Sequence, residues 1–196
     1  MFVAIEGVDG AGKSTLRRLL AERLSARGHV HLVGQNSWLD VGAARAISGV
    51  KFARAGRTVA GVTDYRTDKT LHYRLNIEPA LAHGTVIADR YVLSDVVYRS
   101  VLEGRDTQIL LDSLLDEVLP LPAVTLYLDI DPELAWQRVL HRAKPLRPYE
   151  TAQNLRALSE AFRTIGPQIP GFRPLVVGES DMAEEVAERA ERLVTA

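Results

Sequence analysis

The segment that most constrains this chain runs from Gly7 to Ser14 and reads Gly-Val-Asp-Gly-Ala-Gly-Lys-Ser. It matches the phosphate-binding loop pattern G-x-x-x-x-G-K-[ST] at every fixed position. An apolar run from Phe2 to Ile5 precedes it. After it, leucines recur at helical spacing, at Leu16, Leu19, Leu20 and Leu24. The sequence therefore predicts a strand, a glycine-rich loop and a helix, which is the setting that such a loop requires.

The residue types of this loop suit a polyphosphate better than a plain glycine-rich turn with a surface lysine. Glycines let the backbone curl so that its N–H groups face inward, and the following helix adds its positive N-terminal end. We expect Lys13 to reach the β- and γ-phosphates of ATP and the Ser14 hydroxyl to bind Mg²⁺. The expected ATP-binding residues are Gly7, Val8, Asp9, Gly10, Ala11, Gly12, Lys13, Ser14 and Thr15, with Arg138 from a later helix.

Length and composition limit the classes of protein that the chain can belong to. Its 196 residues suit a single domain, and 46% hydrophobic with 25% charged residues is ordinary globular composition. No apolar run of about twenty residues predicts a membrane span. The N-terminus lacks a signal-peptide pattern and the chain has 0 cysteines, so we expect a cytoplasmic protein. A net charge of −1 gives no basic footprint for nucleic acid.

A second chemical motif follows the predicted strand at residues 85–88. That strand ends in an acid and a base, Asp89 and Arg90. At the carboxyl end of a buried strand, an aspartate suits the water shell of Mg²⁺ and an arginine offers a planar fork to an oxyanion. The alternative is a structural ion pair. Ser94 and Tyr98 follow at i and i+4 spacing, so we expect them on one face of the next helix.

Strands and helices alternate along the rest of the chain, which predicts an α/β fold with a parallel sheet. Further strands are expected at 29–33, 124–128 and 174–177. Helices are expected at 13–27, within 43–53, at 63–83, as a pair over 94–119, from 131, at 151–165 and at 182–194. Gly28, Gly56 and Gly84 are expected to stop the helices that precede them. His29 and His31 lie at strand spacing without a third ligand and receive no role.

The segment at about 141–150 is basic and contains two prolines, so it cannot be a regular helix throughout. Arg138 and Arg142 share one helical face before it, and Arg147 follows within it. Like charges at this spacing destabilise a helix slightly, and an anionic ligand would account for them. We therefore expect a basic lid that closes on ATP, with a solvated charged turn as the alternative.

Taken together, the residues resemble the thymidylate kinases, within the nucleoside-monophosphate kinases of the phosphate-loop class. The motifs that carry the resemblance are Ile5 to Ser14, Pro79-Ala80-Leu81, Asp89-Arg90-Tyr91 with Ser94 and Tyr98, Leu126 to Pro132, and the downstream arginines. The resemblance implies one three-layer domain over residues 1–196, with a five-stranded parallel sheet, helices on both faces and a short basic lid. It also implies a homodimer that phosphorylates a (deoxy)nucleoside monophosphate with ATP and Mg²⁺, dTMP to dTDP being the first candidate.

The resemblance assigns roles by position. Arg90 would hold the acceptor phosphate, and Asp89 would lie near Mg²⁺. Asp9 would reach the acceptor sugar or the metal shell, and Tyr98 would pack against the sugar. With Ala11 inside the loop instead of an arginine, the lid would supply arginines. The expected catalytic residues are Lys13, Asp89, Arg90, Arg142 and Arg147, and the expected metal ligands are Ser14 and Asp89.

The base-reading pattern F-x-x-D-R of the family falls at residues 65–69, where it keeps the aromatic and the acid but ends in Lys69. A lysine lacks the fork of arginine, so Lys69 would read a pyrimidine carbonyl with a different geometry. Trp38 follows the second strand at its carboxyl end, where ligand loops gather. The expected substrate-binding residues are Asp9, Trp38, Tyr65, Lys69, Arg90, Ser94 and Tyr98.

The largest departure from the family lies at Gly34 to Asp40, where its members usually have a segment resembling E-P-G-G-T and an arginine for the acceptor phosphate. Two alternatives therefore remain beside a monophosphate kinase. One is a kinase of a nucleoside or another hydroxyl-bearing metabolite, with Asp40 or Asp9 as general base. The other is a switch protein that hydrolyses ATP without an acceptor.

Overall fold

The computed structural model describes residues 1–51, 61–115 and 120–196. Within these ranges one parallel sheet has the strand order β2-β3-β1-β4-β5. Its strands are β1 (Phe2–Glu6), β2 (His29–Val33), β3 (Gly84–Asp89), β4 (Val124–Ile130) and β5 (Phe172–Val177). The central strand β1 is buried along its whole length, as expected of a strand covered on both faces. Because all strands are parallel, their carboxyl ends meet at one edge of the sheet.

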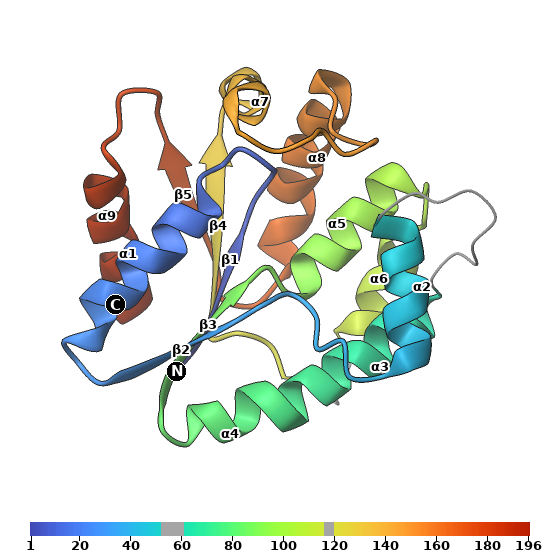
Figure 1. Cartoon of the computed structure of the whole chain (residues 1–196), viewed down its shortest axis with the longest axis horizontal. Coiled ribbons are helices and arrows are strands. Elements are labelled where there is room, and N and C mark those ends of the chain that lie inside the picture. Colours follow the sequence, from blue (N-terminus) through green and yellow to red (C-terminus); the bar gives the residue numbers. More distant parts are fainter. Residues whose placement is uncertain (52–60, 116–119) are drawn as a thin grey trace.

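Helices cover both faces of this sheet, which confirms the predicted three-layer α/β fold (Figure 1). They are α1 (Lys13–Ser25), α2 (Val41–Lys51), α3 (Val62–His72), α4 (Glu78–Leu81), α5 (Val92–Leu102), α6 (Thr107–Leu114), α7 (Pro132–His141), α8 (Ala152–Ile165) and α9 (Ala183–Thr195). Helices α1 and α9 pack together on one face, and α5 and α8 pack together on the other. No helix within the described ranges has both the length and the apolar character needed to cross a bilayer.

The helix predicted at 63–83 is interrupted. A π-helical turn, Tyr73–Ile77, separates α3 from α4, and the Glu78 N–H donates to the Tyr73 carbonyl five residues back. Pro79 follows, and because proline has no N–H it cannot continue the regular i→i−4 pattern. Gly84 does not stop the helix but begins β3, where a Cβ would lie 2.2 Å from the His29 carbonyl oxygen of β2. The strand pairing therefore requires a glycine there.

Other boundaries differ by a few residues. Helix α1 ends at Ser25, α5 begins at Val92, and β5 begins at Phe172, so Pro174 lies inside β5. A proline is tolerated there because β5 is an edge strand. The predicted stop at Gly56 and the last residues of the helix pair at 94–119 fall outside the described residues.

Candidate active site

The phosphate-binding loop lies between β1 and α1, as predicted. Gly10 and Gly12 have φ angles of +86° and +92°, in the left-handed region that favours glycine. A Cβ on Gly10 would lie 2.2 Å from the carbonyl oxygen of Ala135, so the backbone of α7 packs directly on the loop. The loop is thus held between α1 and α7 and can keep its N–H groups in place without a ligand.

Lys13 is buried within this loop, and its ammonium donates to the Val8 carbonyl at 2.7 Å. Burial, aided by repulsion from the Arg90 guanidinium, lowers the pKa of Lys13 to about 7. An incoming polyphosphate would replace the carbonyl and favour the charged form of the amine. Ser14 and Thr15 are exposed beside it.

A strained turn follows β3. Arg90 has a φ of +69°, which is unfavourable for a residue with a side chain. The turn is held by Glu6 of β1, which is fully buried and accepts hydrogen bonds from the backbone N–H of Tyr91 at 2.8 Å and from the Ser94 hydroxyl. Burial raises the pKa of Glu6 to about 7. Glu6 was not among the predicted site residues, although an acid next to a buried apolar strand is a signal for a role.

The guanidinium of Arg90 joins the loop to the next helix. Its Nη1 donates to the Gly7 carbonyl at 2.7 Å and to Ser94 Oγ at 3.0 Å. Its Nη2 donates to Asp9 Oδ1 at 2.9 Å and to Tyr98 Oη at 3.0 Å. Arg90 therefore links the loop that would hold the donor phosphates with the side chains predicted to contact the acceptor.

The Asp9 carboxylate lies at the centre of this cluster. It also accepts hydrogen bonds from Tyr149 Oη at 3.0 Å and from Tyr98 Oη at 3.2 Å. Burial works against its charge, but the neighbouring Arg90 and Lys13 hold the pKa of Asp9 well below its ordinary value. A carboxylate with so low a pKa is a weak general base.

The basic segment predicted as a lid lies against the loop. Glu150 is buried, pairs with the Arg142 guanidinium and accepts from the Arg147 N–H at 2.6 Å. The Arg147 side chain donates to Tyr149 Oη at 2.7 Å, and Tyr149 in turn contacts Asp9. The segment after α7 is irregular, as its two prolines require.

A cavity of about 570 Å³ collects every residue predicted to be catalytic. Those residues are Lys13, Asp89, Arg90, Arg142 and Arg147, and Ser14 lines the cavity too. In the described part of the chain, no three histidine or acidic side chains converge as a ready-made metal site. The side chains of Ser14 and Asp89 nevertheless both line this cavity, and Asp89 Oδ2 lies 3.7 Å from the Arg17 guanidinium.

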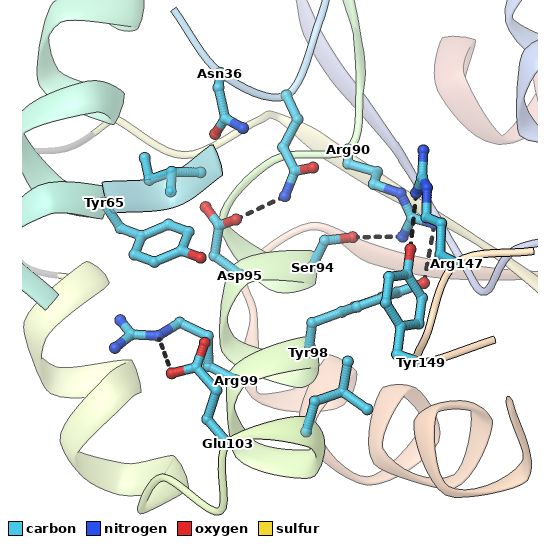
Figure 2. A pocket seen from close by; sticks show the side chains of 13 residues that line it. Asn36, Tyr65, Arg90, Ser94, Asp95, Tyr98, Arg99, Glu103, Arg147 and Tyr149 are labelled. Atoms are coloured by element: carbon cyan, nitrogen blue, oxygen red, sulfur yellow. Dashed lines mark hydrogen bonds and ion pairs between the residues drawn. The ribbon is translucent and has the colours of Figure 1, made fainter. Parts of the chain in front are cut away.

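A second cavity, of about 110 Å³, extends from Arg90 along α5. Figure 2 shows Arg90, Ser94, Tyr98, Arg147 and Tyr149 at one end of it, and Tyr65 with the Arg99–Glu103 ion pair at the other. The residues of this cavity that our sequence analysis did not select are Gln35, Asn36, Ile47, Asp95, Arg99, Leu102, Glu103 and Tyr149. The one sequence signal was Asp95, an acid inside the apolar stretch of α5.

A third cavity, of about 200 Å³, lies on the other side of the loop. It is lined by Gly12 and Thr15 of the loop region, by Arg138 of α7, and by Asp181 before α9. Arg138 and Thr15, two of the predicted ATP-binding residues, thus come together away from Arg90.

Three predicted residues lie elsewhere. Lys69 is 0% exposed and lies beneath the 110 Å³ cavity, so it does not line the cavity as its predicted contact with the base requires. Trp38 is 45% exposed, does not line that cavity, and its backbone N–H donates to Asp68 at 3.0 Å. Asp40, the alternative general base, accepts from the Ala43 N–H at 2.7 Å at the start of α2. Helical spacing placed Lys69 and Tyr65 on one face but could not give their depth.

Comparisons with known proteins identify the family and the fold. The family model described as thymidylate kinase matches residues 5–168. A probable thymidylate kinase of Archaeoglobus fulgidus is 31% identical over 99% of this chain and 94% of its own length, and one of Pyrobaculum calidifontis is 33% identical over 84% and 81%. The crystal structure of a thymidylate kinase from Ehrlichia chaffeensis shares the fold, with a TM-score of 0.71, 20% identity, and coverage of 99% of this chain and 98% of that one. The chain therefore belongs to the thymidylate kinase family, a family of nucleotide kinases.

Proposed function

We propose that the protein transfers the γ-phosphoryl group of ATP to the phosphate of a nucleoside monophosphate, with dTMP as the first acceptor and dTDP as the product. One observation carries the proposal: the Arg90 guanidinium contacts both the phosphate-binding loop and the side chains of the 110 Å³ cavity. An acceptor phosphate on Arg90 would meet the donor phosphates on Lys13. Family membership supports the same reaction.

The proposed chemistry depends on positioning and on neutralising charge. Lys13 holds the β- and γ-phosphate oxygens, and the lid arginines Arg142 and Arg147 meet the charge that develops during transfer. Arg90 aligns the acceptor phosphate, and Ser94 and Tyr98 hold Arg90. The 200 Å³ cavity beside Arg138 offers space for the donor base.

Magnesium belongs to this proposal as well. The hydroxyl of Ser14 and the carboxylate of Asp89 are oxygen donors on the wall of the 570 Å³ cavity, and Mg²⁺ prefers such ligands, keeping waters for its other positions. These residues would hold the ion directly or through its waters. When bound, Mg²⁺ supplies neutralising charge to the donor phosphates.

An acceptor that is already a phosphate needs no general base, and neither Asp9 nor Asp40, the two bases expected for an alcohol acceptor, is well suited to that role. The low pKa of Asp9 makes its carboxylate a poor proton acceptor. Asp40 is engaged at the start of α2. The low pKa of Asp9 and the hydrogen bond of Asp40 both favour a nucleoside monophosphate over a hydroxyl-bearing metabolite as the acceptor.

An acceptor panel tests the proposal. The purified protein with ATP and Mg²⁺ is assayed with dTMP, dUMP, UMP, CMP, dCMP and AMP, and in parallel with thymidine and other nucleosides. We expect turnover with monophosphates, greatest with dTMP. Turnover of nucleosides but not of monophosphates would indicate a kinase of hydroxyl-bearing metabolites. A rate of ATP hydrolysis that stays the same with every acceptor would indicate a switch protein.

Two expectations about the protein in solution accompany the proposal. A homodimer is expected from the family resemblance, and sedimentation equilibrium would test it. A cytoplasmic location is supported by the 0 cysteines, which suit a reducing compartment, and fractionation of cells would test it.

A further inference from the structure

Helix α3 holds the unusual segment after β2 with buried polar side chains. The Asp68 carboxylate accepts from the Ser37 N–H and the Trp38 N–H, both at 3.0 Å. His72 Nε2 contacts the Gly34 carbonyl at 2.8 Å. Asp68, Lys69 and His72 are all buried. The position of residues 34–38 is therefore determined by α3, although the two segments are about thirty residues apart in sequence.

Lys69 fixes the orientation of the Asn36 side chain. The ammonium lies 2.7 Å from the Gln35 carbonyl, 2.8 Å from Asn36 Oδ1 and 2.9 Å from the Asp95 carboxylate. Lys69 is 0% exposed; it donates hydrogen bonds to the Gln35 carbonyl and to Asn36 Oδ1, and its contact with Asp95 is an ion pair. Because an ammonium donates hydrogen bonds and cannot accept them, Asn36 must face Lys69 through its oxygen. Its NH₂ group then points away from Lys69, and Asn36 lines the 110 Å³ cavity (Figure 2).

Asp95 orients the Gln35 amide with its nitrogen toward the ion pair, whereas the Asn36 amide faces the ion pair through its oxygen. Asp95 Oδ1 accepts from Gln35 Nε2 at 2.6 Å. A carboxylate only accepts hydrogen bonds, so the Gln35 amide must face it through nitrogen and keep its oxygen for another partner. Gln35 lines both the 110 Å³ cavity and the 570 Å³ cavity that contains Lys13. Gln35 thus lies nearer to the phosphate end, and Asn36 lies farther along.

We propose that Gln35 and Asn36 determine which acceptor this enzyme takes, and that the buried Lys69–Asp95 ion pair sets the polarity of their amides. Asn36 presents a donor to the cavity farther from Arg90, and Gln35 presents an acceptor nearer to Arg90. That order complements a pyrimidine with a carbonyl at C4, and it opposes one with an amino group there. The inference rests on the proposed function and names the side chains that would select its 4-oxopyrimidine acceptor. Lys69 and Asp95 are positioning residues in this scheme.

The decisive variant is Asn36→Asp, which keeps the shape of the side chain but replaces the NH₂ donor with an acceptor. The readout is the ratio of kcat/KM for dUMP to kcat/KM for dCMP. The wild type should favour dUMP, and Asn36→Asp should lower the ratio by about tenfold or more, with the KM for ATP unchanged. Gln168→Glu is the matched control, because it makes the same chemical change at an exposed position next to the amino end of β5.

The ion pair is tested with the double variant Lys69→Met with Asp95→Asn, because a single change would leave one of these two charges buried without the other. Asp68, which lies 3.8 Å from Lys69, keeps its hydrogen bonds from the Ser37 and Trp38 N–H groups in this variant. Without the ion pair, the amides of Gln35 and Asn36 can turn either way, so the ratio of kcat/KM for dUMP to kcat/KM for dCMP should fall close to one. The value of kcat with saturating dTMP should fall by a smaller factor than this ratio. If Lys69 and Asp95 had a purely structural role, the double variant would lower kcat/KM by the same factor for every acceptor and leave the ratio unchanged.

If the wild type phosphorylates monophosphates but prefers dCMP, or if Asn36→Asp keeps the ratio within twofold of the wild type, the inference is wrong. If no monophosphate is phosphorylated at all, the proposed function itself fails.

Discussion

At the scale of single residues, Arg90 occupies a backbone conformation that only strong local interactions can maintain. A positive φ at a residue with a side chain costs on the order of 1–3 kcal/mol. The Arg90 N–H donates to the Ile5 carbonyl at 3.0 Å, and Glu6 holds the N–H of the next residue, so β1 maintains the turn. The turn directs the guanidinium toward the phosphate-binding loop, where its four hydrogen bonds use both Nη atoms.

Replacement of Arg90 by lysine should therefore weaken acceptor use specifically. Arginine and lysine carry the same charge and the same backbone strain, but lysine cannot contact Gly7, Ser94 and Asp9 with one planar fork. We expect Arg90→Lys to lower kcat/KM for the acceptor by about 10²–10³-fold, with little change in the KM for ATP. Steady-state kinetics with each substrate varied in turn measures both. Arg156→Lys, at an exposed ion pair with Glu133, is the control. An equal loss on both substrates would contradict the assignment.

Glu6 should make the stability of the protein depend on pH. Its pKa is raised from the ordinary 4.5 to about 7, so between these values the folded state holds a proton that the unfolded state has lost. The contribution of Glu6 to the free energy of unfolding is therefore full below pH 4.5 and is lost as the pH rises through 7. Relative to Glu6→Gln, which does not titrate, the wild type should lose on the order of 3 kcal/mol between pH 4.5 and 8.

Urea unfolding of the wild type and of Glu6→Gln at several pH values measures this difference directly, because the other titrating groups are common to both proteins. Glu179→Gln, at an exposed position, is the matched control. A difference between wild type and Glu6→Gln that does not change with pH would show that the carboxyl is not buried as described.

At the scale of elements, the segment at 142–149 that we propose as a lid is held by the buried acid Glu150. Glu150 binds the Arg142 guanidinium and the Arg147 N–H, so it connects both arginines of the lid to the start of α8. Glu150→Ala should release the segment and lower kcat by about ten- to a hundredfold, the usual effect of losing one or two hydrogen bonds to a charged group. Limited proteolysis should also cut within 142–149 faster than in the wild type. Glu133→Ala removes an exposed acid of α7 as the control, and equal effects of the two variants would contradict this role.

The elements also show what periodicity can and cannot predict. The strand, loop and helix around Gly7 to Ser14, and the acid and base after β3, were predictable because each depends on neighbouring residues. The π-helical turn before Pro79 was not predicted, because such a turn leaves no repeating pattern of apolar residues in the sequence. Gln35 and Asn36 were missed for a related reason: residues 34–38 have no regular pattern, and contacts with α3 and α5 determine where they lie. Lys69 was predicted to contact the base, but helical spacing gives no depth, and the side chain is buried and does not line the cavity.

At the scale of the whole molecule, the loop divides the site into two halves. The 110 Å³ cavity, where we propose that the acceptor binds, is built from the segment after β2, from α2, α3 and α5, and from Arg147 and Tyr149. The 200 Å³ cavity is built mainly from α1, α7 and the β5–α9 connection. Asn36 and Arg138 belong to different halves and share no hydrogen-bond or ion-pair partner that the structure shows. Arg90 and Arg147, in contrast, are joined through Asp9 and Tyr149.

Double-mutant cycles should reproduce this division. For Asn36→Asp with Arg138→Ala, the losses in transition-state stabilisation should add to within about 0.5 kcal/mol, because distant sites without shared partners act independently. For Arg90→Lys with Arg147→Lys, the two losses should depart from additivity by about 0.5–3 kcal/mol, because each change disturbs the same Asp9 and Tyr149 contacts. Initial rates with both substrates below their KM values give the four free-energy differences for each cycle. A departure from additivity of more than about 0.5 kcal/mol for Asn36→Asp with Arg138→Ala would contradict this division of the site. It would mean that closure of the proposed lid couples the two halves.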